Sequence, residues 1–133
     1  MRRIILSIAL IFGLAMPGHA QQADIQATID GQIAAFRADD FGQAFAFASP
    51  NIRTLFGTAE NFGRMVRQGY PMVWRPTELR YLDLRDVAGN LWQRVQITDG
   101  NGRVHLLDYQ MIQVDGMWRI NGVQLLPSPD VNV

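Results

Sequence analysis

Hydrophobic and polar positions alternate with helical spacing near the start of the chain. Over residues 23–38, apolar side chains recur every three or four positions, at Ile25, Ile29, Ile33 and Phe36. This spacing places them on one face and is typical of an amphipathic helix. Asp24 lies near the start of the stretch, where an acidic residue is favoured. The pattern therefore predicts a helix over 23–38.

A second, short helix is expected directly afterwards. Asp39 and Asp40 can cap its first turn, and apolar residues continue over 41–48. The Ser49-Pro50 pair then favours an end to the helix, because the residue before a proline avoids helical dihedral angles. We expect a turn over 51–56.

A third helix is predicted from Thr58 onward. The threonine can act as an N-cap, and Phe62, Met65 and Val66 form an apolar stripe before Gly69. The segment 70–76 that follows is expected to be an irregular aromatic connector.

The second half of the chain has the pattern of strands. Four segments are rich in β-branched, aromatic and aliphatic residues, and turn sequences separate them: 79–87, 91–98, 104–114 and 117–126, with turns at 88–89, 99–102 and 115–116. The Asp115-Gly116 turn is the strongest signal, because a type I′ turn needs positive φ at both central residues. Helices followed by an antiparallel meander predict an α+β domain with the helices packed on one sheet face.

This order of elements resembles a known superfamily. Together with the closing sequence Tyr109-Gln-Met-Ile-Gln-Val-Asp-Gly-Met-Trp-Arg-Ile-Asn-Gly-Val123, it resembles the nuclear-transport-factor-2-like (NTF2-like) proteins, and most closely a family of small exported bacterial proteins among them. The resemblance implies a cone-shaped α+β fold with a curved four-stranded sheet and a pocket between helices and sheet. The superfamily contains isomerases, dehydratases, transport adaptors and non-enzymatic domains, so the resemblance implies a fold rather than one function.

The first twenty residues have the pattern of an export signal. Arg2 and Arg3 precede an apolar run over 4–16, and Pro17 and Gly18-His19-Ala20 follow it. The run is about thirteen residues, shorter than the roughly twenty that a helix needs to cross a bilayer. We therefore expect cleavage after Ala20, a periplasmic or secreted protein, and no stable membrane anchor.

Composition restricts what the cleaved chain can be. Removing 20 of the 133 residues leaves 113, which suits one domain over 21–126 followed by a flexible tail over 127–133. The chain has twelve basic and twelve acidic residues, so losing two arginines leaves ten against twelve and a formal charge of −2. This balance argues against nucleic acid as a partner. Without cysteine, the domain has no disulfide or thiol nucleophile, and its hydrophobic core must hold it together.

The predicted turns set a strand register and gather a polar group on one sheet face. They place Gln110 opposite Asn121, and Asp108 opposite both Gln93 and Val123. The other residues of this face are mostly aliphatic, so we expect the helices to cover it, because the opposite face carries more charge and is costlier to bury. The predicted ligand-binding residues are therefore Gln93, Asp108, Gln110 and Asn121.

Asp108 is the only ionisable residue of this group. A buried carboxylate has to be hydrogen-bonded or protonated. It either accepts hydrogen bonds from Gln93 and a nearby arginine or tyrosine, or acts as an acid or base. His105, the single histidine after residue 20, is expected on the surface. Neither a metal site, a cofactor nor a Ser-His-Asp triad is expected, because histidines and clustered acids are too few.

The opposite face gathers the residues Trp92, Tyr109, Met111, Trp118 and Ile120. If the helices leave it uncovered, this apolar patch is an interface and favours a two-fold homodimer. The alternative is that the connector 70–76 folds over it.

Two functions are compatible with these residues. The first is a non-catalytic exported domain that binds a small apolar ligand or a protein partner. The alternative is a pocket enzyme of the isomerase or dehydratase type, with Asp108 as acid or base and Gln93, Gln110 and Asn121 orienting the substrate. The residues identify neither the ligand nor a reaction.

The export signal gives a direct prediction. Protein isolated from the periplasmic or secreted fraction should have an intact mass that begins at Gln21, because a signal peptidase reads the small residues that end at Ala20. Recovery of the chain from the membrane fraction with Met1 retained would contradict this.

Overall fold

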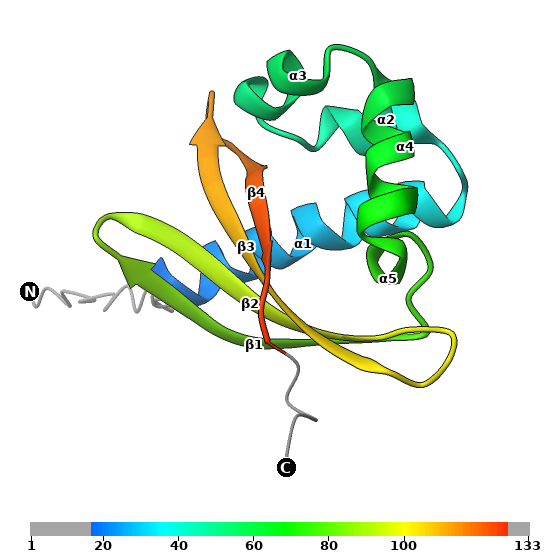
Figure 1. Ribbon diagram of the computed structural model, residues 1–133. Helices are drawn as coiled ribbons and strands as arrows, with labels where there is room; N and C mark the ends of the chain where they lie inside the picture. Colours follow the sequence, from blue (N-terminus) through cyan, green and yellow to red (C-terminus); the bar gives the residue numbers. More distant parts are fainter. Residues whose placement is uncertain (1–16, 128–133) are drawn as a thin grey trace, which may run out of the picture.

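A computed structural model describes residues 17–127. The elements shown in Figure 1 are, in order, α1 (Pro17–Arg37), α2 (Phe41–Ala46), α3 (Pro50–Phe56), α4 (Ala59–Gly69), α5 (Pro71–Trp74), β1 (Glu78–Val87), β2 (Asn90–Thr98), β3 (Val104–Val114) and β4 (Met117–Leu125). The apolar run 4–16 of the expected export signal and residues 128–133 of the expected tail lie outside the described range.

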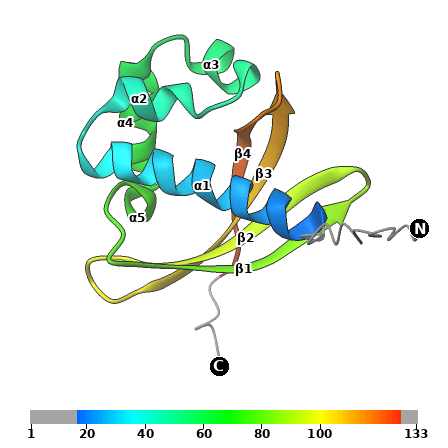
Figure 2. The same ribbon diagram turned by 180° about the vertical axis from the view of Figure 1, so that it is seen from behind.

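The strands form one antiparallel sheet in the order β1-β2-β3-β4. Seen from both sides, α1 crosses one face of this sheet (Figures 1 and 2). Helices α2 and α5 pack on α1, α4 packs on α2 and α5, and α3 lies against α4 and β4. The predicted α+β class, with N-terminal helices followed by a four-stranded meander, is confirmed.

Side-chain caps begin two of the helices as expected. The Asp40 carboxylate accepts a hydrogen bond from the Gln43 N–H at 3.1 Å, and the Thr58 hydroxyl accepts one from the Asn61 N–H at 3.1 Å. Each cap satisfies an N–H that has no partner inside its helix.

Two segments that were expected to be irregular are helical. Ser49 caps α3 by accepting the Ile52 N–H at 3.2 Å, so the Ser49-Pro50 pair begins a helix over the expected turn 51–56. Pro71 likewise begins α5 inside the expected connector. Proline is compatible with a first helical turn because its missing N–H would have no intrahelical partner there.

The hairpin turn between β3 and β4 is confirmed. Val114 pairs with Met117, and the intervening Asp115 and Gly116 have φ of 52° and 78°. Positive φ at both positions matches the type I′ turn that the Asp-Gly sequence favours.

The predicted register is wrong by one residue in two places. A bulge between Gln110 and Met111 places Gln110 opposite Gly122 instead of Asn121. In the β2–β3 hairpin, Thr98 pairs with Val104 instead of Arg103. The Asp99 side chain causes the second shift by accepting the Arg103 N–H at 2.9 Å, which keeps that residue in the turn.

A one-residue shift moves a side chain to the other sheet face, and the face assignment was wrong for this reason. Gln93 pairs with Tyr109 on the face beneath the helices, whereas Asp108 pairs with Arg94 on the outer face. The predicted polar group is therefore divided between the two faces. The helices cover the face that carries Tyr109.

The predicted apolar interface patch lies mostly in the core. Four of its five residues are buried and pack with the isoleucines of α1: Tyr109, Met111, Trp118 and Ile120. Trp92 lies on the outer face opposite Gln110. An exposed patch of five residues therefore does not exist, and its use as a dimer interface was a wrong prediction. Met72 and Val73 of the former connector are buried in the same core.

Close packing between α2 and α4 gives a stability prediction. A Cβ added at Gly63 would lie 2.6 Å from Cδ1 and 2.8 Å from Cγ of Phe41. Gly63→Ala should therefore lower the free energy of unfolding by about 1–3 kcal/mol through overpacking. Gly69→Ala is the control, because no atom lies within 4 Å of its added Cβ. Urea denaturation measures both, and equal stabilities for the two variants would contradict the close contact.

Candidate functional site

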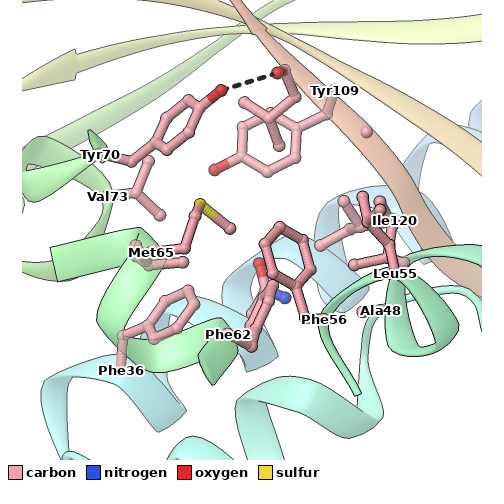
Figure 3. A pocket seen from close by; sticks show the side chains of 15 residues that line it. Phe36, Ala48, Leu55, Phe56, Phe62, Met65, Tyr70, Val73, Tyr109 and Ile120 are labelled. Atoms are coloured by element: carbon pink, nitrogen blue, oxygen red, sulfur yellow. Dashed lines mark hydrogen bonds between the residues drawn. The ribbon is translucent and has the colours of Figure 1, made fainter. Parts of the chain in front are cut away.

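A cavity of about 230 Å³ lies between the short helices and the strands β3 and β4. Its lining residues are Gln32, Phe36, Ala48, Ile52, Leu55, Phe56, Phe62, Met65, Val66, Tyr70, Val73, Tyr109, Ile120, Gly122 and Val123 (Figure 3). Apart from one glutamine, two tyrosines and one glycine, every one of these side chains is apolar. The walls come from helices that are distant in sequence from the strands they face.

Backbone hydrogen bonds join the start of α3 to the edge of the sheet. The Ser49 N–H donates to the Ile120 carbonyl at 2.8 Å, and the Ile120 N–H donates to the Phe47 carbonyl at 3.0 Å. This single bridge between Ala48 and Ile120 is parallel. It fixes the point at which α3 leaves the sheet, and the cavity begins there.

Asn121 strengthens the same junction. Its Oδ1 accepts a hydrogen bond from Ser49 Oγ at 2.7 Å and another from Asn51 Nδ2 at 3.3 Å. Its Nδ2 donates to Gln110 Oε1 at 3.1 Å. The structure thus brings Asn121 and Gln110 together, although Gln110 pairs with Gly122 in the sheet. Neither side chain lines the cavity, and their role is to hold α3 against β4.

Tyr109 contributes the most unusual polar atom of the cavity. The residue is fully buried, and its hydroxyl has no hydrogen-bond partner within residues 17–127. In Figure 3 the hydroxyl points toward the space bounded by Tyr70, Val73 and Met65. Burial, together with the nearby Tyr70, raises the pKa of Tyr109. The phenol therefore stays protonated at neutral pH and can donate a hydrogen bond.

The second phenol of the cavity already uses its proton. Tyr70 donates its hydroxyl hydrogen to the Val123 carbonyl at 3.3 Å (Figure 3). Its oxygen keeps lone pairs that can accept a hydrogen bond. The cavity therefore has an apolar body, the amide of Gln32, which donates to the Ala44 carbonyl at 3.1 Å, and two tyrosine hydroxyls, of which one is a donor without a partner.

A family model described as a domain of unknown function (DUF4864) matches residues 18–133 of the chain. The chain belongs to this family. Comparison with curated proteins gives no match.

Asp108, the strongest candidate from sequence, has a structural role in this DUF4864 domain. It is buried and hydrogen-bonded, as predicted. Of the expected partners, an arginine is confirmed and Gln93 was wrong. Its carboxylate contacts Arg85 at 2.9 Å and Arg94 at 3.1 Å on the outer face of the sheet. The hydrogen bonds that Arg94 donates to Asp108 raise the pKa of Arg94. Because Asp108 does not line the cavity, the geometry gives no support to its use as acid or base there.

Gln93 lies beneath the helices but outside the cavity lining. Its Nε2 donates to the carbonyls of Leu82 and Arg94, both at 2.9 Å. These bonds span the irregular stretch of β1 between Tyr81 and Leu84, where the ladder with β2 is interrupted. Gln93 therefore replaces missing sheet hydrogen bonds.

The remaining chemistry-bearing residues are also accounted for by local structure. His105 Nε2 lies 2.8 Å from Asp99 Oδ2 at the β2–β3 turn, and this contact lowers the pKa of Asp99. Within residues 17–127, no group of three or more histidine, cysteine, aspartate or glutamate side chains could hold a metal ion. No helix in that range is long and apolar enough to cross a membrane.

Tyr109 and Tyr70 were missed as site residues for two different reasons. Tyr109 was assigned to the wrong sheet face, because the predicted β2–β3 register paired Thr98 with Arg103 instead of Val104. Tyr70 was placed in a connector whose helix begins at Pro71. The available signal was Pro71 itself, since a proline is favoured at the first position of a helix.

The ion pairs of Asp108 give a prediction that distinguishes a structural role of this residue from a role in ligand binding. Asp108→Asn should lower the free energy of unfolding by about 1–3 kcal/mol, because two arginines lose their charged partner. Ligand binding in the cavity should be unchanged. Asp83→Asn, an exposed position, should change stability by less than about 0.5 kcal/mol. Thermal or urea unfolding measures the stability of both variants. An Asp108→Asn variant that keeps wild-type stability but no longer binds ligand in the cavity would contradict the structural role of Asp108.

Proposed function

We propose that this domain binds a small, predominantly apolar ligand in the cavity between its short helices and its sheet. The observation that carries the proposal is a cavity of about 230 Å³ lined almost entirely by apolar side chains. A well-packed domain leaves few voids larger than a water molecule. An apolar cavity of about 150 Å³ is known to stay dry and to hold benzene.

The rim of the cavity also favours an apolar ligand. Leu55 on α3 lines the cavity, yet 72% of its surface is exposed to solvent. An exposed leucine alone has no significance. Here it shares the cavity lining with the partly buried Phe56 and Met65, so apolar surface continues from the outside to the interior.

The lining residues support binding rather than catalysis. They contain no carboxylate, imidazole, ammonium or guanidinium group, and the two phenols are held protonated or already hydrogen-bonded. A general acid and base with pKa values near neutrality is what an isomerase or dehydratase needs. We therefore favour a ligand carrier or sensor over the enzyme alternative.

Two further parts of the proposal rest on sequence. We propose that the domain is exported, with the family match beginning at residue 18, after the apolar run 4–16. We also propose that the fold is of the NTF2-like cone type, which agrees with helices packed on one face of a four-stranded antiparallel sheet.

Filling the cavity tests the proposed function. Val123 lines the cavity and is partly buried, so Val123→Phe should occupy part of the space while the Val123 carbonyl keeps its bond to Tyr70. Indane, a compact bicyclic hydrocarbon, is the probe. Titration followed by methyl NMR should show saturable shifts of cavity residues in the wild type and at least about tenfold weaker binding in the variant.

Val87→Phe is the matched control, because the same change occurs at a half-exposed position at the end of β1. It should bind indane as the wild type does. Failure of the wild type to bind indane, or equal binding by the Val123→Phe variant, would contradict a ligand site in this cavity.

A further inference from the structure

The partnerless hydroxyl of Tyr109 restricts the ligand more sharply than the apolar walls do. A buried hydroxyl that loses its hydrogen bonds to water and gains none in return destabilises the fold. Nearly all buried polar groups in folded proteins have a partner, so each exception calls for a reason. Within residues 17–127, the only other buried side-chain atom of this kind is Oε1 of Gln93, which lies outside the cavity lining.

Tyr81 shows that a phenol hydroxyl on the same sheet face can find hydrogen-bond partners. Its hydroxyl bonds to the Gln26 carbonyl at 3.1 Å and to Asp30 Oδ1 at 2.6 Å, both on α1. Tyr109 has no such partner opposite it, because the helices that face it supply Val73, Met65 and other apolar side chains. Its hydroxyl therefore points toward the cavity instead of a helix carbonyl.

The electrostatic surroundings determine the charge of a compatible ligand. No lining residue is charged, so a carboxylate or an ammonium group would lose its hydration without gaining a counter-ion. The Tyr109 phenol is a neutral donor, and its raised pKa keeps its proton in place. A neutral hydrogen-bond acceptor is the group that completes this arrangement.

We infer, on the basis of the proposed function, that the ligand is a neutral, mainly hydrocarbon molecule with one carbonyl-type oxygen, which accepts a hydrogen bond from Tyr109. The apolar body occupies the space between α3, α4 and the sheet. The carbonyl lies at the end of the cavity that Tyr109 and Tyr70 share. Ketones, aldehydes and esters belong to this class, whereas free carboxylates do not.

A side chain of the cavity lining has to move before the ligand oxygen can reach the Tyr109 hydroxyl. The Tyr109 oxygen is shielded from solvent, so one lining side chain must move aside when the oxygen arrives. Met65 is the residue suited to this, because it is unbranched, has three rotatable side-chain bonds and is only partly buried.

A pair of probes that differ in one oxygen tests this inference. Indane and 1-indanone have the same bicyclic skeleton, and only 1-indanone carries a carbonyl. Their dissociation constants are measured on the wild type and on Tyr109→Phe. The dissociation constant of 1-indanone divided by that of indane should be about tenfold larger in the variant than in the wild type, because only 1-indanone loses a hydrogen bond. Taking the ratio in both proteins cancels the difference in hydration between the probes.

Tyr81→Phe is the matched control, since it removes a phenol hydroxyl from the same sheet face outside the cavity lining. It should lower stability and leave the ratio unchanged. Tyr109→Phe should keep or gain stability, because it removes a buried hydroxyl without a partner.

Infrared spectroscopy of 1-indanone bound to the wild type gives a readout that needs no variant. A carbonyl stretch below its frequency in hexane supports the hydrogen bond, and a stretch at the hexane frequency overturns it. An unchanged ratio in Tyr109→Phe likewise overturns the carbonyl assignment while indane binding, and with it the proposed function, still stands. If neither probe binds the wild type, the proposed function fails as well.

Discussion

The architecture around the cavity depends on one short contact between a loop and a strand. Segment 47–49 pairs with β4 only at Ile120, and the chain then departs from the sheet as α3. A longer pairing would have laid the segment flat along the strand and closed the space that α3 spans. Because Asn121 binds both Ser49 and Asn51, the departure point is fixed by side chains as well as by backbone. The bulge in β4 places Asn121 where it can make these bonds.

The order of elements could be predicted because it depends on local signals. The spacing of Ile25, Ile29 and Ile33 gave the long helix, and Asp115-Gly116 gave the final hairpin. Each signal acts within a few residues, where propensity and turn chemistry dominate. Helix α3 was missed because Ser49-Pro50 was interpreted as a helix end, and α5 because residues 70–76 were interpreted as an irregular connector. In both places the proline fits the first turn of a helix.

The site was harder to predict because it depends on register far from the turns. One turn residue held by Asp99 moved Asp108 to the outer face and Tyr109 to the inner face. One bulge then placed Val123 opposite Tyr109, in the lining of the cavity. Counting residues outward from a hairpin accumulates such errors, since each irregularity exchanges the two faces. Burial of Asp108 was nevertheless predicted correctly. The expected aliphatic surroundings were wrong, however, because Asp108 lies on the outer face, where Arg85 of β1 and Arg94 of β2 are its partners.

The shallow attachment of α3 has a kinetic consequence. None of its side chains is fully buried, and it ends at Gly57, whose φ of 79° breaks the helix. Detaching this segment exposes far less apolar surface than detaching α1, which carries Ile25, Ile29 and Phe36 in the core. Local opening of such a segment costs less free energy than global unfolding. A ligand can therefore enter or leave the cavity when α3 detaches, without unfolding of the domain. Ligand exchange can then be fast even if the folded state is long-lived.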